Sequence, residues 1–162
     1  MSGRFWLITV LTLIVVLLIG NKFIIPHFQS QPPDQILNTN QTTLTIADTT
    51  LNIEIADEPS EIQQGLSGRP ALAPNAGMLF ILSAKRIPTF WMKDMRIALD
   101  FIWIDGDRVV DITENIPPPA SGTTDLQLLT YSPLVPVTKV LEVNAGFISS
   151  HQISIGDKVK IN

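Results

Sequence analysis

The chain has 162 residues, a net charge of -4 and no cysteine. This length suits one domain with an attachment, and the modest, scattered acidic charge argues against nucleic acid as a partner. Without cysteine there can be no disulfide, thiolate catalysis or cysteine-ligated zinc. With only two histidines in addition, no metal site and no cofactor are expected.

The first 25 residues predict a single transmembrane helix that anchors the chain. Residues 5–19 (FWLITVLTLIVVLLI) carry no charge, and the apolar pattern resumes at residues 23–25. A helix continued through Ile25, with Lys22 reaching the headgroups, spans about 30 Å. A cleaved signal peptide is the alternative, although no small-x-small cleavage site follows. Either reading places the rest of the chain on the extracytoplasmic side, periplasmic or extracellular.

Residues 26–42 predict a flexible linker, and residues 43–162 predict the folded domain. The segment PHFQSQPPDQILNTN at residues 26–40 is polar, contains three prolines and shows no periodicity. This composition is typical of a semi-extended tether that spaces a domain from a membrane.

The domain opens with the pattern of a β-hairpin followed by a short helix. Apolar residues alternate with polar ones over residues 43–55, with a break at Asp48 and Thr49, as expected for two half-buried strands. Residues 59–66 (PSEIQQGL) begin with proline and an acid, and Gly68 follows. These residues are favoured at the two ends of a helix.

The remaining segments predict further short strands. Residues 77–82 (GMLFIL) and 89–92 (TFWM) read as buried strands. Residues 99–104 and 108–113 flank Asp105-Gly106-Asp107, which favours a tight hairpin turn. Three prolines at residues 117–119 require a loop or a sheet edge, and residues 137–143 and 157–161 supply the last strands. The expected fold is mainly β, an antiparallel β-sandwich or partly closed barrel with one or two short helices.

Four motifs in this order resemble the DUF192 family, also called UPF0127. They are GLSGRPALAPNAGMLF at residues 65–80, FWMKDMRIALDFIWID at 90–105, VLEVNAGF at 140–147 and GDKV at 156–159. The resemblance implies a small β-sandwich, often preceded by a signal or anchor, and it implies no established activity. Ala98 and Asp94 depart from the proline and asparagine usual in the family, and the extra charge at Asp94 bears on any ligand shared by the family.

Candidate ligand-binding residues are Arg69, Trp91, Lys93 and Asp100. Strand alternation places Trp91 and Lys93 on one face, where an aromatic ring beside a cation suits a sugar or another polar ligand. Arg69 follows the predicted helix and offers paired donors to an anion. In the alternative reading, Trp91 belongs to the core and Lys93 points to solvent.

Two acids, Asp100 and Glu142, lie within otherwise apolar strands. A carboxylate placed there needs a partner or shifts its pKa. One reading pairs it with Arg69, Lys93 or Arg96, and the other makes it functional. If both acids faced one cleft, they would be weak candidates for the catalytic pair of a glycoside hydrolase.

Three functions follow as hypotheses. The favoured one is a membrane-tethered module that binds a small polar or glycan ligand without covalent chemistry. The second is a hydrolase or lyase that uses Asp100 and Glu142 on an envelope component. The third is a scaffold for other envelope proteins, which requires an exposed apolar patch rather than a pocket. The ligand and the oligomeric state are left open.

Overall fold

The computed structural model describes residues 42–162. The predicted anchor at residues 1–25 and all but the last residue of the predicted linker lie outside the described residues. Within residues 42–162, no helix has both the length and the apolar character needed to cross a bilayer.

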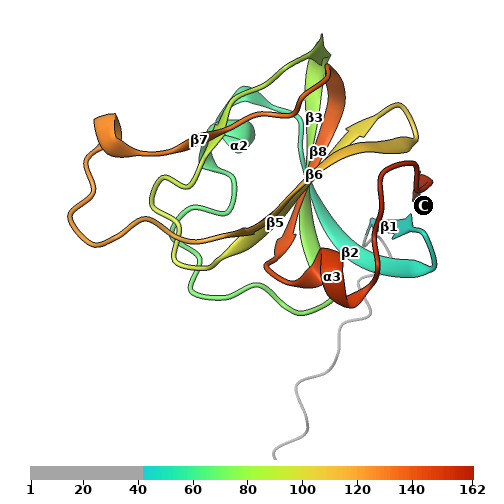
Figure 1. Cartoon of the computed structure of the whole chain (residues 1–162), viewed down its shortest axis with the longest axis horizontal. Coiled ribbons are helices and arrows are strands. Elements are labelled where there is room, and N and C mark those ends of the chain that lie inside the picture. Colours follow the sequence, from blue (N-terminus) through green and yellow to red (C-terminus); the bar gives the residue numbers. More distant parts are fainter. Residues whose placement is uncertain (1–41) are drawn as a thin grey trace, which may run out of the picture. The chain divides into compact units, whose positions relative to one another are not determined.

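The domain is mainly β, as the sequence predicts, and its strands form one large sheet and one small one (Figure 1). The large sheet has seven strands in the order β6-β5-β8-β3-β2-β1-β9, and β4 pairs with β7. The strands are β1 (Thr43–Ile46), β2 (Thr49–Ala56), β3 (Ala76–Arg86), β4 (Phe90–Trp91), β5 (Leu99–Asp105), β6 (Arg108–Ile116), β7 (Thr130–Tyr131), β8 (Val137–Asn144) and β9 (Val159–Ile161). The helices are α2 (Pro59–Gln64), α3 (Phe147–Ser150) and the 3-10 turn η1 (Asp125–Gln127).

Both predicted hairpins are confirmed. Strands β1 and β2 pair antiparallel with Ile46 opposite Thr49, and β5 and β6 pair antiparallel with Asp105 opposite Arg108. Gly106 adopts a φ of 59° in the second turn, a left-handed conformation that glycine enters without a steric penalty.

The prediction of a wholly antiparallel domain is wrong at one place. Strands β2 and β3 run parallel, from the Asn52–Ala76 pair to the Ala56–Phe80 pair. A parallel pair requires a crossover connection, and here residues 57–75 provide it with only one short helix, α2. The sequence pattern lacks the long amphipathic helix by which such crossovers are usually predicted.

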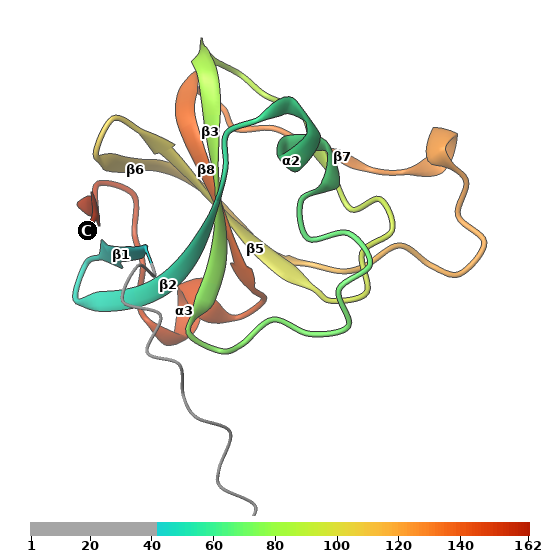
Figure 2. The same cartoon turned by 180° about the vertical axis from the view of Figure 1, so that it is seen from behind.

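The large sheet is a partly closed barrel rather than two stacked sheets, so the sandwich alternative is wrong. The two edge strands approach one another at one end, where Arg108 forms a β-bridge with Lys158. The backbone N–H of Val109 donates to the carbonyl of Asp157 at 3.0 Å, and that of Val159 donates to Asp107 at 2.8 Å. The opposite end of the sheet stays open and fans outward (Figure 2).

Central strands β3, β5 and β8 are buried on both faces, which explains their nearly continuous apolar sequences. Inside the curl lies one core, which α3 closes: Leu44, Ile46, Leu51, Ile53, Leu79, Ile102, Ile104, Val109, Leu141, Val143, Phe147, Ile148, Ile153 and Val159. A second core lies on the opposite face: Ala56, Leu66, Met78, Phe80, Leu82, Met92, Met95, Leu99, Phe101, Trp103, Ile116, Val137 and Val140. The second core includes Leu66, which follows α2, and Met92 and Met95, which follow β4. Helix α2, strand β4 and the residues after each of them therefore cover this face of the sheet.

Helix α2 forms where the sequence predicts it. Pro59 occupies the first turn, where its missing N–H has no helical partner to lose. The Glu61 side chain accepts hydrogen bonds from the backbone N–H groups of Asp57 and Glu58, both at 3.3 Å, which caps the helix start. Gly65 ends the helix with a φ of 48°.

Candidate functional site

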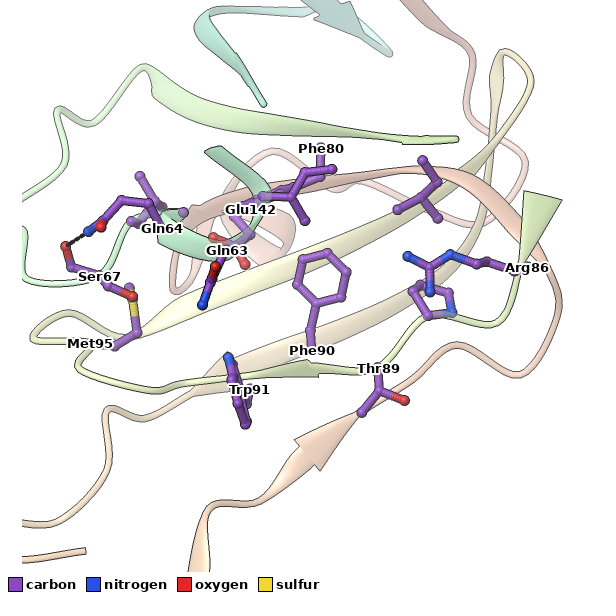
Figure 3. A pocket seen from close by; sticks show the side chains of 15 residues that line it. Gln63, Gln64, Ser67, Phe80, Arg86, Thr89, Phe90, Trp91, Met95 and Glu142 are labelled. Carbon is purple, nitrogen blue, oxygen red and sulfur yellow. Dashed lines mark hydrogen bonds between the residues drawn. The ribbon is translucent and has the colours of Figure 1, made fainter. Parts of the chain in front are cut away.

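A cleft opens between α2 and β4 on the outer face of the sheet (Figure 3). Its inner part has a volume of about 110 Å³, and an adjoining outer hollow has about 440 Å³. Gln63, Gln64, Ser67 and Trp91 line both parts, so we treat them as one α2–β4 cleft. The inner part is otherwise lined by Ile62, Gly65, Leu66, Phe80, Leu82, Arg86, Pro88, Thr89, Phe90, Met95 and Glu142.

Two hydrogen bonds fix the α2 wall to the β4 wall at one end of the cleft. The Ser67 hydroxyl donates to the carbonyl of Lys93 at 2.9 Å, and the backbone N–H of Gly68 donates to the carbonyl of Asp94 at 2.9 Å. Gly68 has a φ of 77° and Asp94 a φ of 57°. The left-handed turn at each residue lets these two loops meet.

Phe90 holds the β4 wall against the sheet. Its ring makes edge-to-face contacts with Phe80, Phe101 and Trp103, at centroid distances of 5.1, 5.8 and 5.7 Å. Such aromatic pairs contribute about 1 kcal/mol each beyond their buried area. The wall that carries Trp91 is therefore rigidly placed.

Glu142 lies at the floor of the cleft and is the site's most unusual group. The residue is only 5% exposed, and its carboxyl oxygens hydrogen-bond to no other residue within 42–162. In that same range, no fully enclosed polar side-chain atom lacks a partner, so the carboxyl opens onto the cleft. Burial raises the pKa of Glu142 to about 8, because a charged carboxylate is poorly solvated there. At neutral pH the group is mostly uncharged.

Trp91 and Lys93 lie close together as predicted, although β4 ends at Trp91 and Lys93 lies in the turn that follows. The Lys93 ammonium is 5.7 Å from the centroid of the Trp91 ring, whereas Met92 between them is buried. Trp91 is 50% exposed, so it is not a core residue. Lys93 also forms an ion pair with Asp125 of η1, and this hydrogen bond raises the pKa of Lys93.

Asp100 does not reach the cleft, although the sequence marks it as a candidate. It is fully buried, and its carboxylate accepts the backbone N–H of Asn115 at 2.7 Å and that of Ile148 at 3.0 Å. In the β5–β8 register, Asp100 lies opposite Val143 while Phe101 lies opposite Glu142. Adjacent residues of a strand point to opposite faces, so the two carboxyl groups lie on different faces and the structure does not bring them together.

Arg69 is placed beside the cleft rather than in it. Its guanidinium makes a two-pronged pair with Glu54 of β2, at 2.5 and 2.6 Å. This hydrogen bond lowers the pKa of Glu54. The expected pairing of Arg69, Lys93 or Arg96 with Asp100 or Glu142 is therefore wrong for the described residues, whose ion pairs join Arg69, Lys85 and Lys93 to other acids.

Arg86 and Gln63 belong to the site, but neither was among the residues predicted to bind a ligand, and the sequence indicated Arg86 only as part of a basic stretch around Phe90 and Trp91. Arg86 ends β3, beyond a register irregularity that follows Ile81, and its guanidinium points into the cleft (Figure 3). Gln63 reaches from α2 toward Trp91. Neither position carries a motif, since only the tertiary packing of α2 and β3 around the cleft brings these residues together.

Fold and site together define a small partly closed β-barrel domain with one outer cleft and a buried acid at its floor. The chain belongs to the DUF192 family, a group described as an uncharacterized ACR, which it matches over residues 42–161. This confirms the resemblance seen in the sequence. Among curated proteins, none matches the chain.

Two solved structures are similar to the domain. One comes from Sinorhizobium meliloti 1021 and is described as a candidate transcription regulator. It is 30% identical, with a TM-score of 0.65, and the match covers 74% of this chain and 93% of that one. The other, from Novosphingobium aromaticivorans DSM 12444, is described as a protein of unknown function. It is 29% identical, with a TM-score of 0.65, over 73% and 83% of the two chains.

Proposed function

We propose that this protein is a membrane-tethered, extracytoplasmic module that binds a small polar ligand in the α2–β4 cleft without covalent chemistry. The observation that carries the proposal is the Glu142 carboxyl, which is buried, reachable from the cleft and without a partner among residues 42–162. A ligand that hydrogen-bonds to this carboxyl would supply a partner that residues 42–162 do not provide.

The walls of the cleft support a ligand with both polar and apolar parts. Phe80, Phe90 and Leu82 supply apolar surface, and Trp91 supplies a half-exposed ring at the mouth. Gln63 and Thr89 add donors and acceptors. A few polar groups set in an apolar lining are typical of small-molecule sites.

Removal of the Trp91 ring tests the proposal. A panel of small polar metabolites and short oligosaccharides is screened by the shift of the melting temperature. We expect a binder to raise the melting temperature of the wild type and to have little effect on Trp91→Ala, because the ring forms the mouth of the cleft. Ile155→Ala, which removes an exposed side chain outside the cleft, serves as the control. If no compound binds, or if a binder raises the melting temperature of Trp91→Ala as much as that of the wild type, the proposal is contradicted.

A protein-interaction scaffold is the second candidate, and exposed apolar residues between β6 and β8 favour it. Leu126, Leu129 and Leu134 are 99%, 72% and 88% exposed. Exposed apolar patches on a soluble surface often mark contacts with other molecules. DNA binding has less support, because the net charge is -4. Hydrolysis by a carboxylate pair also has less support, because Asp100 and Glu142 lie on opposite faces of the sheet.

A further inference from the structure

One basic and one acidic side chain line the inner part of the α2–β4 cleft, and neither has a partner among residues 42–162. Among the residues that line it, only Arg86 and Glu142 carry titratable groups. Within residues 42–162, neither makes an ion pair or a side-chain hydrogen bond, whereas Arg69, Lys85 and Lys93 each pair with an acid. The exposed base Arg86 and the buried acid Glu142 therefore line the same small cavity.

Their placement fits a ligand that bears both charges. In Figure 3, Arg86 and Glu142 approach the space around the Phe90 ring from different strands, β3 and β8. An ammonium group at Glu142 would give the buried carboxyl the opposite charge that it lacks. A carboxylate at Arg86 would meet a guanidinium, which recognises carboxylates through two parallel hydrogen bonds.

The aromatic lining favours the same arrangement. Phe80, Phe90 and Trp91 line the cavity together with Glu142, and ring faces attract an ammonium group. The volume of about 110 Å³ leaves room for a short carbon skeleton only, since pockets for drug-sized ligands measure about 300 Å³ or more.

We propose that the inner cleft binds a small zwitterion, such as an aliphatic amino acid, with its ammonium at Glu142 and its carboxylate at Arg86. This inference rests on the proposed function and names its ligand class. When the ammonium binds, the Glu142 carboxyl gives its proton to solvent and becomes a carboxylate paired with the ligand. The ligand enters and leaves chemically unchanged.

Three probes that share an isobutyl group separate the two ends of the cavity. L-valine carries both charges, isobutylamine lacks the carboxylate, and 3-methylbutanoate lacks the ammonium. Binding to the full-length chain, kept in detergent because of its apolar first residues, is followed by the indole N–H signals in NMR. Trp91 reports the cleft, and Trp103, whose indole donates to Thr113 at 2.9 Å in the core behind Phe90, reports whether the core stays folded.

We expect L-valine to shift the Trp91 signal and to bind at least about tenfold more tightly than either half-probe. Glu142→Gln should weaken L-valine and isobutylamine but not 3-methylbutanoate. Arg86→Gln should weaken L-valine and 3-methylbutanoate but not isobutylamine. Exposed Glu114→Gln and Arg96→Gln should leave all three unchanged. Near pH 7, L-valine should also release close to one proton from wild type and none from Glu142→Gln.

The possible results separate the two proposals. If both half-probes bind as well as L-valine, or if the two variants weaken all probes alike, the zwitterion proposal is overturned. If neutral sugars or metabolites bind in a Trp91-dependent way and the zwitterion does not, the ligand class is wrong and the binding function stands. If nothing binds, both proposals fail.

Discussion

Replacing Asp100 by asparagine is expected to lower the free energy of unfolding by about 3 kcal/mol. The Asp100 carboxylate joins three elements, because it lies on β5, accepts the N–H of Asn115 on β6 and accepts the N–H of Ile148 at the start of α3. Asn115 has a φ of 56° and lies where the β5–β6 register shifts. An amide can accept only one of the two hydrogen bonds and turns its NH₂ group toward the other donor.

The free energy of unfolding by urea measures this effect, with Asp94→Asn as the matched control. Asp94 is exposed and already in a left-handed conformation, which asparagine tolerates well, so its replacement should change stability by less than about 0.5 kcal/mol. If Asp100→Asn also changed the free energy of unfolding by less than about 0.5 kcal/mol, the structural role given to Asp100 would be wrong, and a functional role would be the better explanation.

Gly77→Val is expected to cost at least about 3 kcal/mol, or to prevent folding. A Cβ atom at Gly77 would lie 2.9 Å from the carbonyl oxygen of Glu142 and 3.1 Å from side-chain atoms of Leu141 and Val143. These atoms belong to β8, the neighbour of β3 at the centre of the sheet. Neither backbone can move away without breaking the pairing.

The yield of folded protein and its urea midpoint measure the effect of Gly77→Val. Ala84→Val, at the exposed end of the same strand, is the control and should be nearly neutral. A Gly77→Val protein as stable as the control would show that β3 and β8 do not approach as closely as described.

Local signals in the sequence were enough to predict most strands and the helix α2. The Asp105-Gly106-Asp107 turn and the period-two alternation over residues 43–55 depend only on neighbouring residues. The nearly continuous apolar sequences of β3, β5 and β8 likewise predict strands that are buried on both faces. These predictions were correct because each depends on the chemistry of a few adjacent residues.

The arrangement of the strands could not be predicted in the same way. The parallel pairing of β2 and β3 and the contact of Val109 with Asp157 join segments that are distant or ambiguous in sequence. A short connection with one stubby helix fits both an antiparallel and a parallel course. Only the packing of α2 against the outer face selects the parallel one.

The candidate site was predicted in part, and strand register explains the remainder. Trp91 and Lys93 were placed together on the assumption that the strand continues to Lys93; the strand ends at Trp91, and the two side chains are nevertheless close. The sequence could not tell whether Asp100 and Glu142 share a face, since a shift of one residue in the β5–β8 pairing would place both on the same face. The place of Arg86 in the cleft was not predicted, because β3 extends four residues beyond the apolar run that predicted the strand.

The state of Glu142 also links the cleft to stability. The folded protein holds a proton on this carboxyl that the unfolded chain gives up above its ordinary pKa of 4.5. The stability contributed by the neutral acid is therefore complete below about pH 4.5 and is lost as the pH rises to about 8, at up to about 1.4 kcal/mol per pH unit. The hydrogen bond with Arg69 lowers the pKa of Glu54 below 4.5. The stability that this ionised carboxylate contributes is therefore lost as the pH falls through the lowered pKa.

The central claim is that Glu142 faces the cleft as an uncharged acid at neutral pH, and an NMR titration of its side-chain carboxyl carbon tests it most directly. The resonance is assigned by its loss in Glu142→Gln, and Glu54 provides an internal reference that titrates below 4.5. The Glu142 resonance is expected to move near pH 8. A midpoint near 4.5 would contradict it, because the carboxyl would then be charged and solvated at neutral pH.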